Sequence, residues 1–154
     1  MMKYLRSLKS INPPFFLFLS LLLMLILMWI FPAVDMIIFP WNLLGLLPLG
    51  LGSIFNILAD REFHTRHTTV KPDELPSLLI TDGIYCYSRN PMYMGMVLIL
   101  LGFAILLGSW VSFLVLPGFT AFVHYRFICH EEKNLKELFG EGWLAYQIKT
   151  PRWI

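Results

Sequence analysis

Cysteine and charge are both scarce in this sequence of 154 residues. The two cysteines, Cys86 and Cys129, are too few for a disulfide scaffold. Charged residues make up 14% of the chain, against about 25% in a typical soluble domain. The net charge of +2, without a dense basic stripe, argues against a nucleic-acid partner. Hydrophobic residues make up 57%, which excludes intrinsic disorder and indicates a membrane protein.

The sequence also lacks the spacings of common metal and hydrolase sites. Its histidines are His64, His67, His124 and His130, and their spacing does not match zinc ligation. No Ser-His-Asp arrangement or phosphate-binding glycine loop is recognisable. We therefore expect no metal ion, and we expect the cysteines to be reduced thiols.

Three long runs carry no Asp, Glu, Lys or Arg, namely 10–34, 36–59 and 90–125. A helix needs about 20 apolar residues to cross the hydrocarbon core of a bilayer. The first two runs each fit one span, and the third fits two short spans with a turn at 108–110. We therefore predict an all-α polytopic membrane protein with four spans, near 14–32, 40–59, 91–108 and 110–127, followed by cytosolic C-terminal helices. In the second span, Gly45, Gly50 and Gly52 permit close helix packing, and Pro48 predicts a kink.

The basic residues predict the orientation of these spans. All twelve Lys and Arg residues fall on one side of the membrane in this arrangement, and the other side carries only Asp35. The positive-inside rule then places both termini and the loop between spans two and three in the cytosol. The apolar core from Phe15 to Phe31 is too long for a signal peptide, so we expect it to remain as a span.

We accordingly expect a single membrane domain over 1–154 in a prokaryotic inner membrane. Two N-terminal spans occupy 1–60, and 61–154 holds two further spans and the C-terminal helices.

The segment before the third span has features of a ligand site. Thr81-Asp82-Gly83 is typical of a turn, and Asn90-Pro91 is typical of a helix start, with Asn90 as a candidate N-cap. The exposed N–H groups of that helix either are capped only by Asn90 or bind an anionic group. Arg89 either serves the same ligand or marks the membrane boundary. The neighbouring tyrosines Tyr85, Tyr87 and Tyr93 are either interfacial belt residues or aromatic faces for a cation.

The C-terminal segment from His130 predicts an amphipathic helix that ends at Gly140. One face carries Ile128, Glu131, Leu135, Leu138 and Phe139. Glu132 and Lys136, and likewise Lys133 and Glu137, have the spacing of exposed ion pairs. Glu131 instead lies on the apolar face, where a carboxylate needs a partner. That partner is Arg89, Arg126, Arg152 or a ligand.

Two motifs in these segments resemble those of a known family. Residues 83–95 contain Gly83-Ile84-Tyr85 and Arg89-Asn90-Pro91-Met92-Tyr93-Met94-Gly95, similar to G-x-Y … R-[HN]-P-x-Y-x-G. Residues 131–152 contain Glu131-Glu132, Leu135, Phe139-Gly140, Tyr146 and Pro151-Arg152, similar to E-E-x-x-L-x-x-x-F-G … Y … P-R. Over roughly 68–154 the chain resembles the integral-membrane methyltransferases related to isoprenylcysteine carboxyl methyltransferases and phospholipid methyltransferases.

The resemblance implies S-adenosylmethionine as methyl donor, bound by the cytosolic ends of the last spans and the C-terminal helices. It implies contacts from Ser77, Leu78, Leu79, Ile80, Tyr85, Asn90, Pro91, Met92 and Tyr93, with Glu131 holding a polar group of the donor. It further implies catalytic roles for Asn90, Glu131 and Arg126. Asn90 stands where eukaryotic members have His, and Arg126 lies near the position of the substrate-side arginine of the family.

We therefore predict an S-adenosylmethionine-dependent methyltransferase acting on a lipid-like or prenylated acceptor that moves in sideways between spans three and four. Carboxyl O-methylation is favoured, because a carboxylate needs no base before it attacks. Membrane lipids are the other expected partners. Two alternatives are an NADPH-dependent membrane reductase of the sterol-reductase type, whose last spans are similar, and a small non-enzymatic transporter or scaffold.

Overall fold

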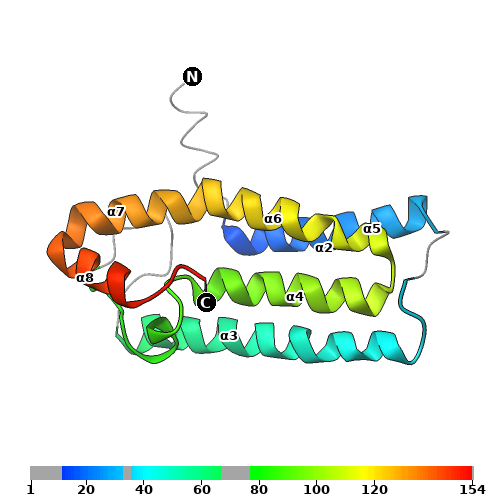
Figure 1. Cartoon of the computed structure of the whole chain (residues 1–154), viewed down its shortest axis with the longest axis horizontal. Coiled ribbons are helices and arrows are strands. Elements are labelled where there is room, and N and C mark those ends of the chain that lie inside the picture. Colours follow the sequence, from blue (N-terminus) through cyan, green and yellow to red (C-terminus); the bar gives the residue numbers. More distant parts are fainter. Residues whose placement is uncertain (1–11, 33–35, 67–76, 154) are drawn as a thin grey trace, which may run out of the picture.

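The computed structural model describes residues 12–32, 36–66 and 77–153, and these residues form helices and connecting turns without a strand. In chain order the elements are α2 (Pro13–Ile30), η2 (Trp41–Gly45), α3 (Leu46–Thr65), η3 (Gly83–Cys86), α4 (Pro91–Leu107), α5 (Trp110–Phe113), α6 (Val115–Val123), η4 (His124–Ile128), α7 (Cys129–Phe139) and α8 (Glu141–Lys149). The long helices run roughly parallel to one axis, and α7, α8 and η3 gather at one end (Figure 1).

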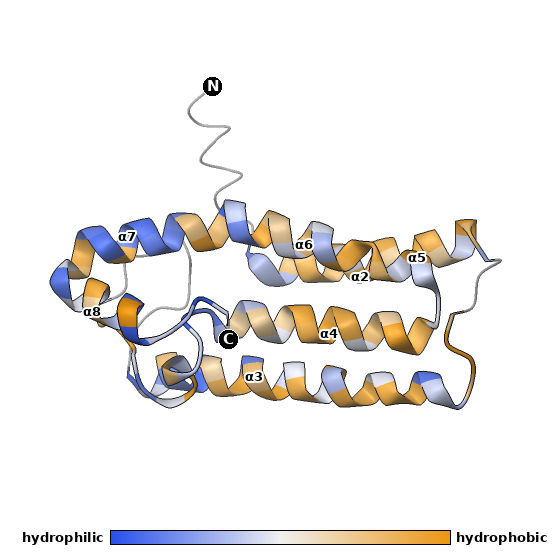
Figure 2. Ribbon diagram, in the orientation of Figure 1, coloured by the Kyte–Doolittle hydropathy of each residue, from blue (hydrophilic) through white to orange (hydrophobic). Residues whose placement is uncertain are grey.

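Three helical stretches are long and apolar enough to cross a membrane: 13–30, 41–65 and 110–139. Helix α4 has 17 residues and is equally apolar in character (Figure 2). At about 1.5 Å per residue, it is roughly 26 Å long, close to the thickness of a bilayer core. The prediction of an all-α membrane protein is confirmed, and its four apolar segments lie where the charge-free runs placed them.

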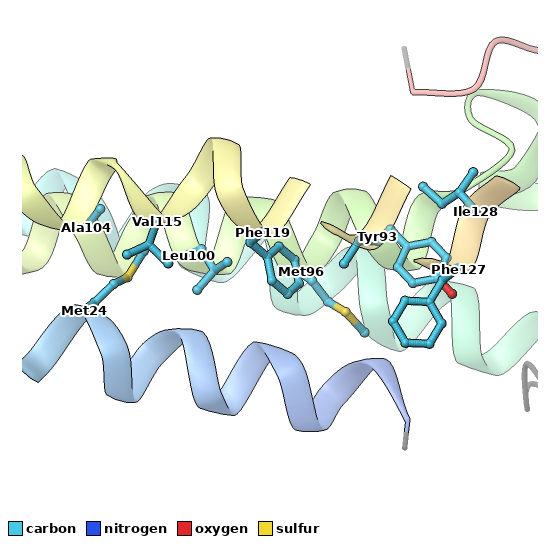
Figure 3. Packing of buried hydrophobic residues seen from close by; sticks show 10 residues of the cluster. Met24, Tyr93, Met96, Leu100, Ala104, Val115, Phe119, Phe127 and Ile128 are labelled. Atoms are coloured by element: carbon cyan, nitrogen blue, oxygen red, sulfur yellow. The ribbon is translucent and has the colours of Figure 1, made fainter. Parts of the chain in front are cut away.

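Helix α4 is the centre of the bundle and packs against α2, α3 and α6. Its inward residues join α2 and the 110–139 helix in one cluster, made of Met24, Tyr93, Met96, Leu100, Ala104, Val115, Phe119, Val123, Phe127 and Ile128 (Figure 3). Many large apolar side chains on the other helices point outward, such as Trp29 at 84% exposed. Outward apolar side chains suit a helix whose surroundings are lipid rather than water.

Helices α3 and α4 approach closely through paired glycines. A Cβ atom at Gly52 would collide with the backbone of Gly95, and one at Gly45 would collide with the backbone of Gly102. The amide of Asn42 also donates to the carbonyl oxygen of Leu106 at 3.1 Å. The predicted packing role of the second-span glycines is therefore confirmed for Gly45 and Gly52, whereas Gly50 has no atom within 4 Å of its would-be Cβ.

Two local features of the spans are the turn at 108–110 and the position of Pro48. The turn at 108–110 is confirmed, because α4 ends in Gly108 with φ +68° and α5 begins at Trp110. Pro48 lies in the first turn of α3, directly after the 3₁₀ turn η2. A proline in a first turn removes no intrahelical hydrogen bond, so the bonding of α3 does not require a kink there, and the kink stays a prediction.

The predicted fourth span near 110–127 and the predicted C-terminal amphipathic helix form one helical stretch, Trp110–Phe139. This stretch includes a turn at Leu114, between α5 and α6, and a π-helical turn at His124–Ile128. A π turn inserts a residue and rotates the following face of the helix. Phe127 and Ile128 are both buried in consequence, and the rigid helix carries Glu131 from the membrane span to the polar end of the bundle.

The close approach of α3 and α4 predicts a position-specific effect of adding a methyl group. Gly52→Ala should lower the free energy of unfolding by about 1–3 kcal/mol, because α3 must move away from α4. Gly50→Ala is the matched control, since the added methyl group meets open space, and it should leave stability unchanged or slightly improved. Thermal unfolding in detergent, followed by size-exclusion chromatography, measures both. Equal melting temperatures of the two variants would contradict the packing role of Gly52.

Candidate active site

A cavity of about 350 Å³ opens at the polar end of the bundle. It lies between the first residues of α2 and α4, the end of α3, the segment 78–80 and the helices α7 and α8. The sequence-predicted residues that line it are Leu78, Leu79, Ile80, Tyr85, Asn90, Pro91, Met92, Tyr93 and Glu131. Ser77 is exposed beside this segment and does not line the cavity, and neither does Arg126.

Glu131 projects from α7 into the cavity, and its first partner is a tyrosine. The hydroxyl of Tyr93 donates to Oε1 of Glu131 at 2.5 Å. Tyr93 is itself held in place because its ring stacks on that of Phe127, with centroids 6.3 Å apart. Glu131 therefore has a partner for its carboxylate, as predicted. That partner is Tyr93, and none of the three arginines considered from the sequence pairs with Glu131 among the described contacts.

Arg89 reaches the cavity from the residue before Asn90, and its side chain is only 7% exposed. Its Nη1 lies 3.1 Å from Oε1 of Glu132, but the N–H bond is not aligned with that oxygen. Nε and Nη1 of Arg89 thus remain buried without a hydrogen-bond partner. Because buried N–H groups are nearly always satisfied in folded proteins, this guanidinium is suited to receive an anionic ligand group.

Glu132 is the carboxylate that binds the arginines. Nε and Nη2 of Arg152 donate to Oε1 and Oε2 of Glu132 at 2.9 and 2.5 Å, a bidentate pair. This contact raises the pKa of Arg152 above its usual value. The predicted surface pair of Glu132 with Lys136 is therefore wrong, since the Glu132 side chain is 12% exposed and faces inward. The other predicted pair, Lys133 with Glu137, is confirmed at 4.0 Å on the surface.

The chain after α8 is fastened along the segment that precedes α4. The backbone N–H of Arg89 donates to the carbonyl oxygen of Pro151 at 3.0 Å. The carbonyl oxygen of Arg152 accepts from the hydroxyl of Ser88 and from Nδ2 of Asn90, each at 3.1 Å. Asn90 does occupy the N-cap position of α4, but its side chain makes no capping bond. Its amide instead fixes the C-terminal segment against the cavity wall.

Another part of the cavity wall is formed by Phe63, Tyr85 and Tyr146. The hydroxyl of Tyr146 donates to the carbonyl oxygen of Tyr85 at 2.7 Å, which joins α8 to η3. Burial raises the pKa values of both phenols, so they stay neutral. The ring of Phe63 meets that of Tyr85 edge-on at 5.7 Å. Of the three tyrosines noted in the sequence, Tyr85 and Tyr93 thus line the cavity, whereas Tyr87 is 76% exposed.

Several lining residues were not anticipated from the sequence. Asp60 and Phe63 come from the end of α3, Asn12 precedes α2, and Trp143 comes from α8. The only signal for Asn12, Asp60 and Phe63 in the sequence is a position at or just beyond one end of an apolar run, and Trp143 has no such signal. Arg126, by contrast, lies in the π turn with its guanidinium 5.5 Å from the centroid of the Phe127 ring. Within 12–32, 36–66 and 77–153, no three His, Cys, Asp or Glu residues come together as a metal site.

The polar groups of the cavity suit a small molecule that carries charges of both signs. The unpartnered N–H groups of Arg89 suit an anionic group, and the carboxylates of Glu131 and Asp60 suit positive charge. Phe63 and Trp143 add aromatic faces, which suit a cation or a flat ring. A volume near 350 Å³ is also within the usual range of about 300–1,000 Å³ for small-molecule sites.

The ion pairs around Glu132 predict a difference between two glutamates of the same helix. Glu132→Gln should lower the free energy of unfolding by about 2–3 kcal/mol, because it leaves two arginines without their counter-charge. Glu137→Gln removes an exposed pair and should change stability by about 0.5 kcal/mol or less. Thermal unfolding and protease cleavage of the C-terminal segment measure the difference. If both variants behave alike, Glu132 does not hold that segment.

Comparisons with known proteins agree with the motifs that form this site. The sequence model of a family described as phospholipid methyltransferase matches residues 41–142. Over 119 residues the chain is 34% identical to a protein-S-isoprenylcysteine O-methyltransferase of Schizosaccharomyces pombe, covering 76% of this chain and 50% of that protein. It is 34% identical over 107 residues to a protein-S-isoprenylcysteine O-methyltransferase of Xenopus laevis, covering 67% of this chain and 32% of that protein.

The chain thus spans half or less of the length of these curated relatives. The family match begins at η2 and ends within α8, so it includes α3, α4 and the whole helix that carries Glu131 and Glu132. Since it covers well over half of the chain, this integral membrane protein belongs to the phospholipid methyltransferase family.

Proposed function

We propose that the protein is an S-adenosylmethionine-dependent methyltransferase that methylates a carboxylate on a prenylated, lipid-like acceptor. The observation that carries the proposal is the cavity at the polar end of the bundle. It collects both motifs and places the Glu131–Tyr93 pair near a buried guanidinium with unpartnered N–H groups. The family membership and the similarity to two isoprenylcysteine O-methyltransferases support the same reaction class.

The residues of the cavity would divide the work of holding the donor. Arg89 would bind the donor's carboxylate, and Glu131 would bind its ammonium, with Tyr93 keeping the Glu131 carboxylate in place. Leu78, Leu79, Ile80, Pro91 and Met92 would supply the apolar wall. Asn90 would act by position, because an amide does not titrate in this range and its Nδ2 is already bonded to the C-terminal segment. A role for Arg126 stays a prediction, since that residue is not among those lining the cavity.

When bound, S-adenosylmethionine supplies a methyl group already activated by the positive sulfur. The protein's task is then to align the acceptor with that methyl group, and positioning of this kind contributes roughly 7–11 kcal/mol to a bimolecular reaction. A carboxylate acceptor arrives without a proton to lose. That suits a cavity whose described lining contains no histidine, and in which burial raises the pKa values of the Tyr85 and Tyr146 phenols.

The distribution of charge supports a cytosolic position for the site. The described Lys and Arg residues lie at or beyond the end of the bundle where α7, α8 and the cavity lie (Figure 2). At the other end, the described residues 36–45 and 107–112 include no Lys, Arg, Asp or Glu. By the positive-inside rule, the cavity faces the cytosol, where a water-soluble donor is available. The prokaryotic inner membrane, and the division of the chain near residue 60, stay predictions.

Calorimetry on purified protein tests the donor site. Wild-type protein should bind S-adenosylmethionine, and Glu131→Gln should weaken binding by about 10–100-fold, the value of a charge-assisted hydrogen bond of roughly 1.5–3 kcal/mol. Glu137→Gln is the matched control on the same helix and should bind like wild type, because its side chain is exposed and distant from the lining. Equal weakening by both variants, or binding of NADPH in place of the donor, would overturn the proposal.

Transfer of a radiolabelled methyl group tests the reaction. With S-farnesylcysteine as acceptor, the labelled product should be a base-labile methyl ester that releases methanol. Tyr93→Phe should reduce turnover, because it removes the hydroxyl that holds the Glu131 carboxylate in place. Tyr87→Phe changes an exposed tyrosine and should leave turnover unchanged. A stable N-methyl product on an aminophospholipid would show instead that the acceptor is an amine.

A further inference from the structure

A second cavity lies on the membrane-facing side of the bundle, in a groove between α2 and α6. Its volume is about 470 Å³, and apolar side chains line it apart from Ser20. Helix α2 contributes one face, from Phe16 to Leu27, and the other helix contributes Leu114 to Phe122. At about 1.5 Å per residue, the α2 side of the groove is roughly 16 Å long. The groove therefore has the length and polarity of a site for a single extended hydrocarbon chain.

The groove and the active-site cavity lie next to each other along the same helix. Pro13 and Pro14 of α2 line the first cavity, and Phe16 begins the second. The Phe16 ring contacts that of Phe127 at 5.7 Å, and Phe127 stacks on Tyr93, the partner of Glu131. Figure 3 shows Tyr93 and Phe127 lying beside each other at this junction. Two aromatic contacts and one hydrogen bond thus connect the groove to the carboxylate that would hold the donor.

The floor of the groove is open because of one residue. Gly118 is exposed in α6, and a Cβ added there would meet no atom within 4 Å. One helical turn away on either side, the helix carries Leu114 and Phe122, whose side chains form walls instead. A hydrocarbon chain lying over Gly118 can thus approach the helix backbone directly.

We propose that this groove holds the isoprenoid chain of the methyl acceptor, with the carboxylate end directed past Phe16 toward the active site. The identity of the isoprenoid chain rests on the proposed function. Its location rests on the two adjoining cavities. It puts the acceptor between the first and fourth spans, rather than between the third and fourth as the sequence alone led us to expect. Helix α4 is buried in the centre of the bundle behind them.

Filling the groove at Gly118 tests the proposal. Gly118→Leu adds a side chain without a clash and with better helix propensity, so the protein should fold. Gly50→Leu is the matched control, since it too is a helical glycine with no atom within 4 Å of its would-be Cβ, but it lies on α3 outside the groove. Ser20→Leu, on the opposite wall, is a second groove-filling variant that guards against a folding defect in the first.

Binding of S-farnesylcysteine and of its short-chain S-prenyl analogue is measured by calorimetry in nanodiscs, without the donor. Gly118→Leu and Ser20→Leu should weaken binding of the farnesyl compound by at least tenfold, and the Gly50 variant should bind like wild type. The weaker binding of the short analogue should not change further. Affinity for S-adenosylmethionine should be the same in all four proteins.

The outcomes separate this inference from the proposed function. If wild type binds S-farnesylcysteine through the groove but transfers no methyl group to it, the groove assignment holds and the proposed reaction fails. If the farnesyl compound binds equally to wild type and both groove variants, the chain lies elsewhere and the inference is overturned. The inference is also overturned if the groove variants displace only a diacyl phospholipid and leave binding of S-farnesylcysteine unchanged. The same holds if they change the oligomeric state without changing the affinity for S-farnesylcysteine.

Discussion

A carboxylate held between two guanidinium groups joins the separate parts of the polar end. Glu132 on α7 meets Arg89, which precedes α4, and Arg152, which follows α8. A buried charge is costly without a partner, so each of these three chain segments is held where the other two are. The backbone bonds from Arg89 to Pro151 and from Asn90 to Arg152 follow from that arrangement. The ion pairs and these bonds together hold the C-terminal segment beside the residues that precede α4.

The membrane imposes the second constraint, because lipid cannot satisfy polar groups. Many large apolar side chains therefore point outward from the spans, and hydrophilic residues gather at the end where α7 and α8 lie (Figure 2). Close packing inside the bundle then relies on small residues, such as Gly52 against Gly95, rather than on expulsion of water. The long helix from Trp110 to Phe139 connects the two environments, and its π turn presents Phe127 to the lipid-side core and Glu131 to the polar cavity.

The two cavities lie in these two environments, one at the polar end of the bundle and one on its apolar side. One is lined by a guanidinium, carboxylates and aromatic faces, and the other is an apolar groove. They adjoin at Phe16, Phe127 and Tyr93. Under the proposed function, a water-soluble donor and a lipid-bound acceptor would meet at this junction, which would account for an active site at the membrane surface.

The number and order of the helices followed from the sequence, since each charge-free run has the length that a bilayer requires. Glu131 could also be identified in advance, because a carboxylate on an apolar helix face is a local anomaly. Glu132 could not, because Lys136 offered an equally good partner one turn away, and only the folded chain brings Arg89 and Arg152 closer. Likewise, Asp60, Phe63 and Trp143 join the cavity through contacts between helices far apart in sequence. Helical periodicity reports which face of a helix is apolar, but the partner of that face depends on how the helices pack, which only the tertiary structure decides.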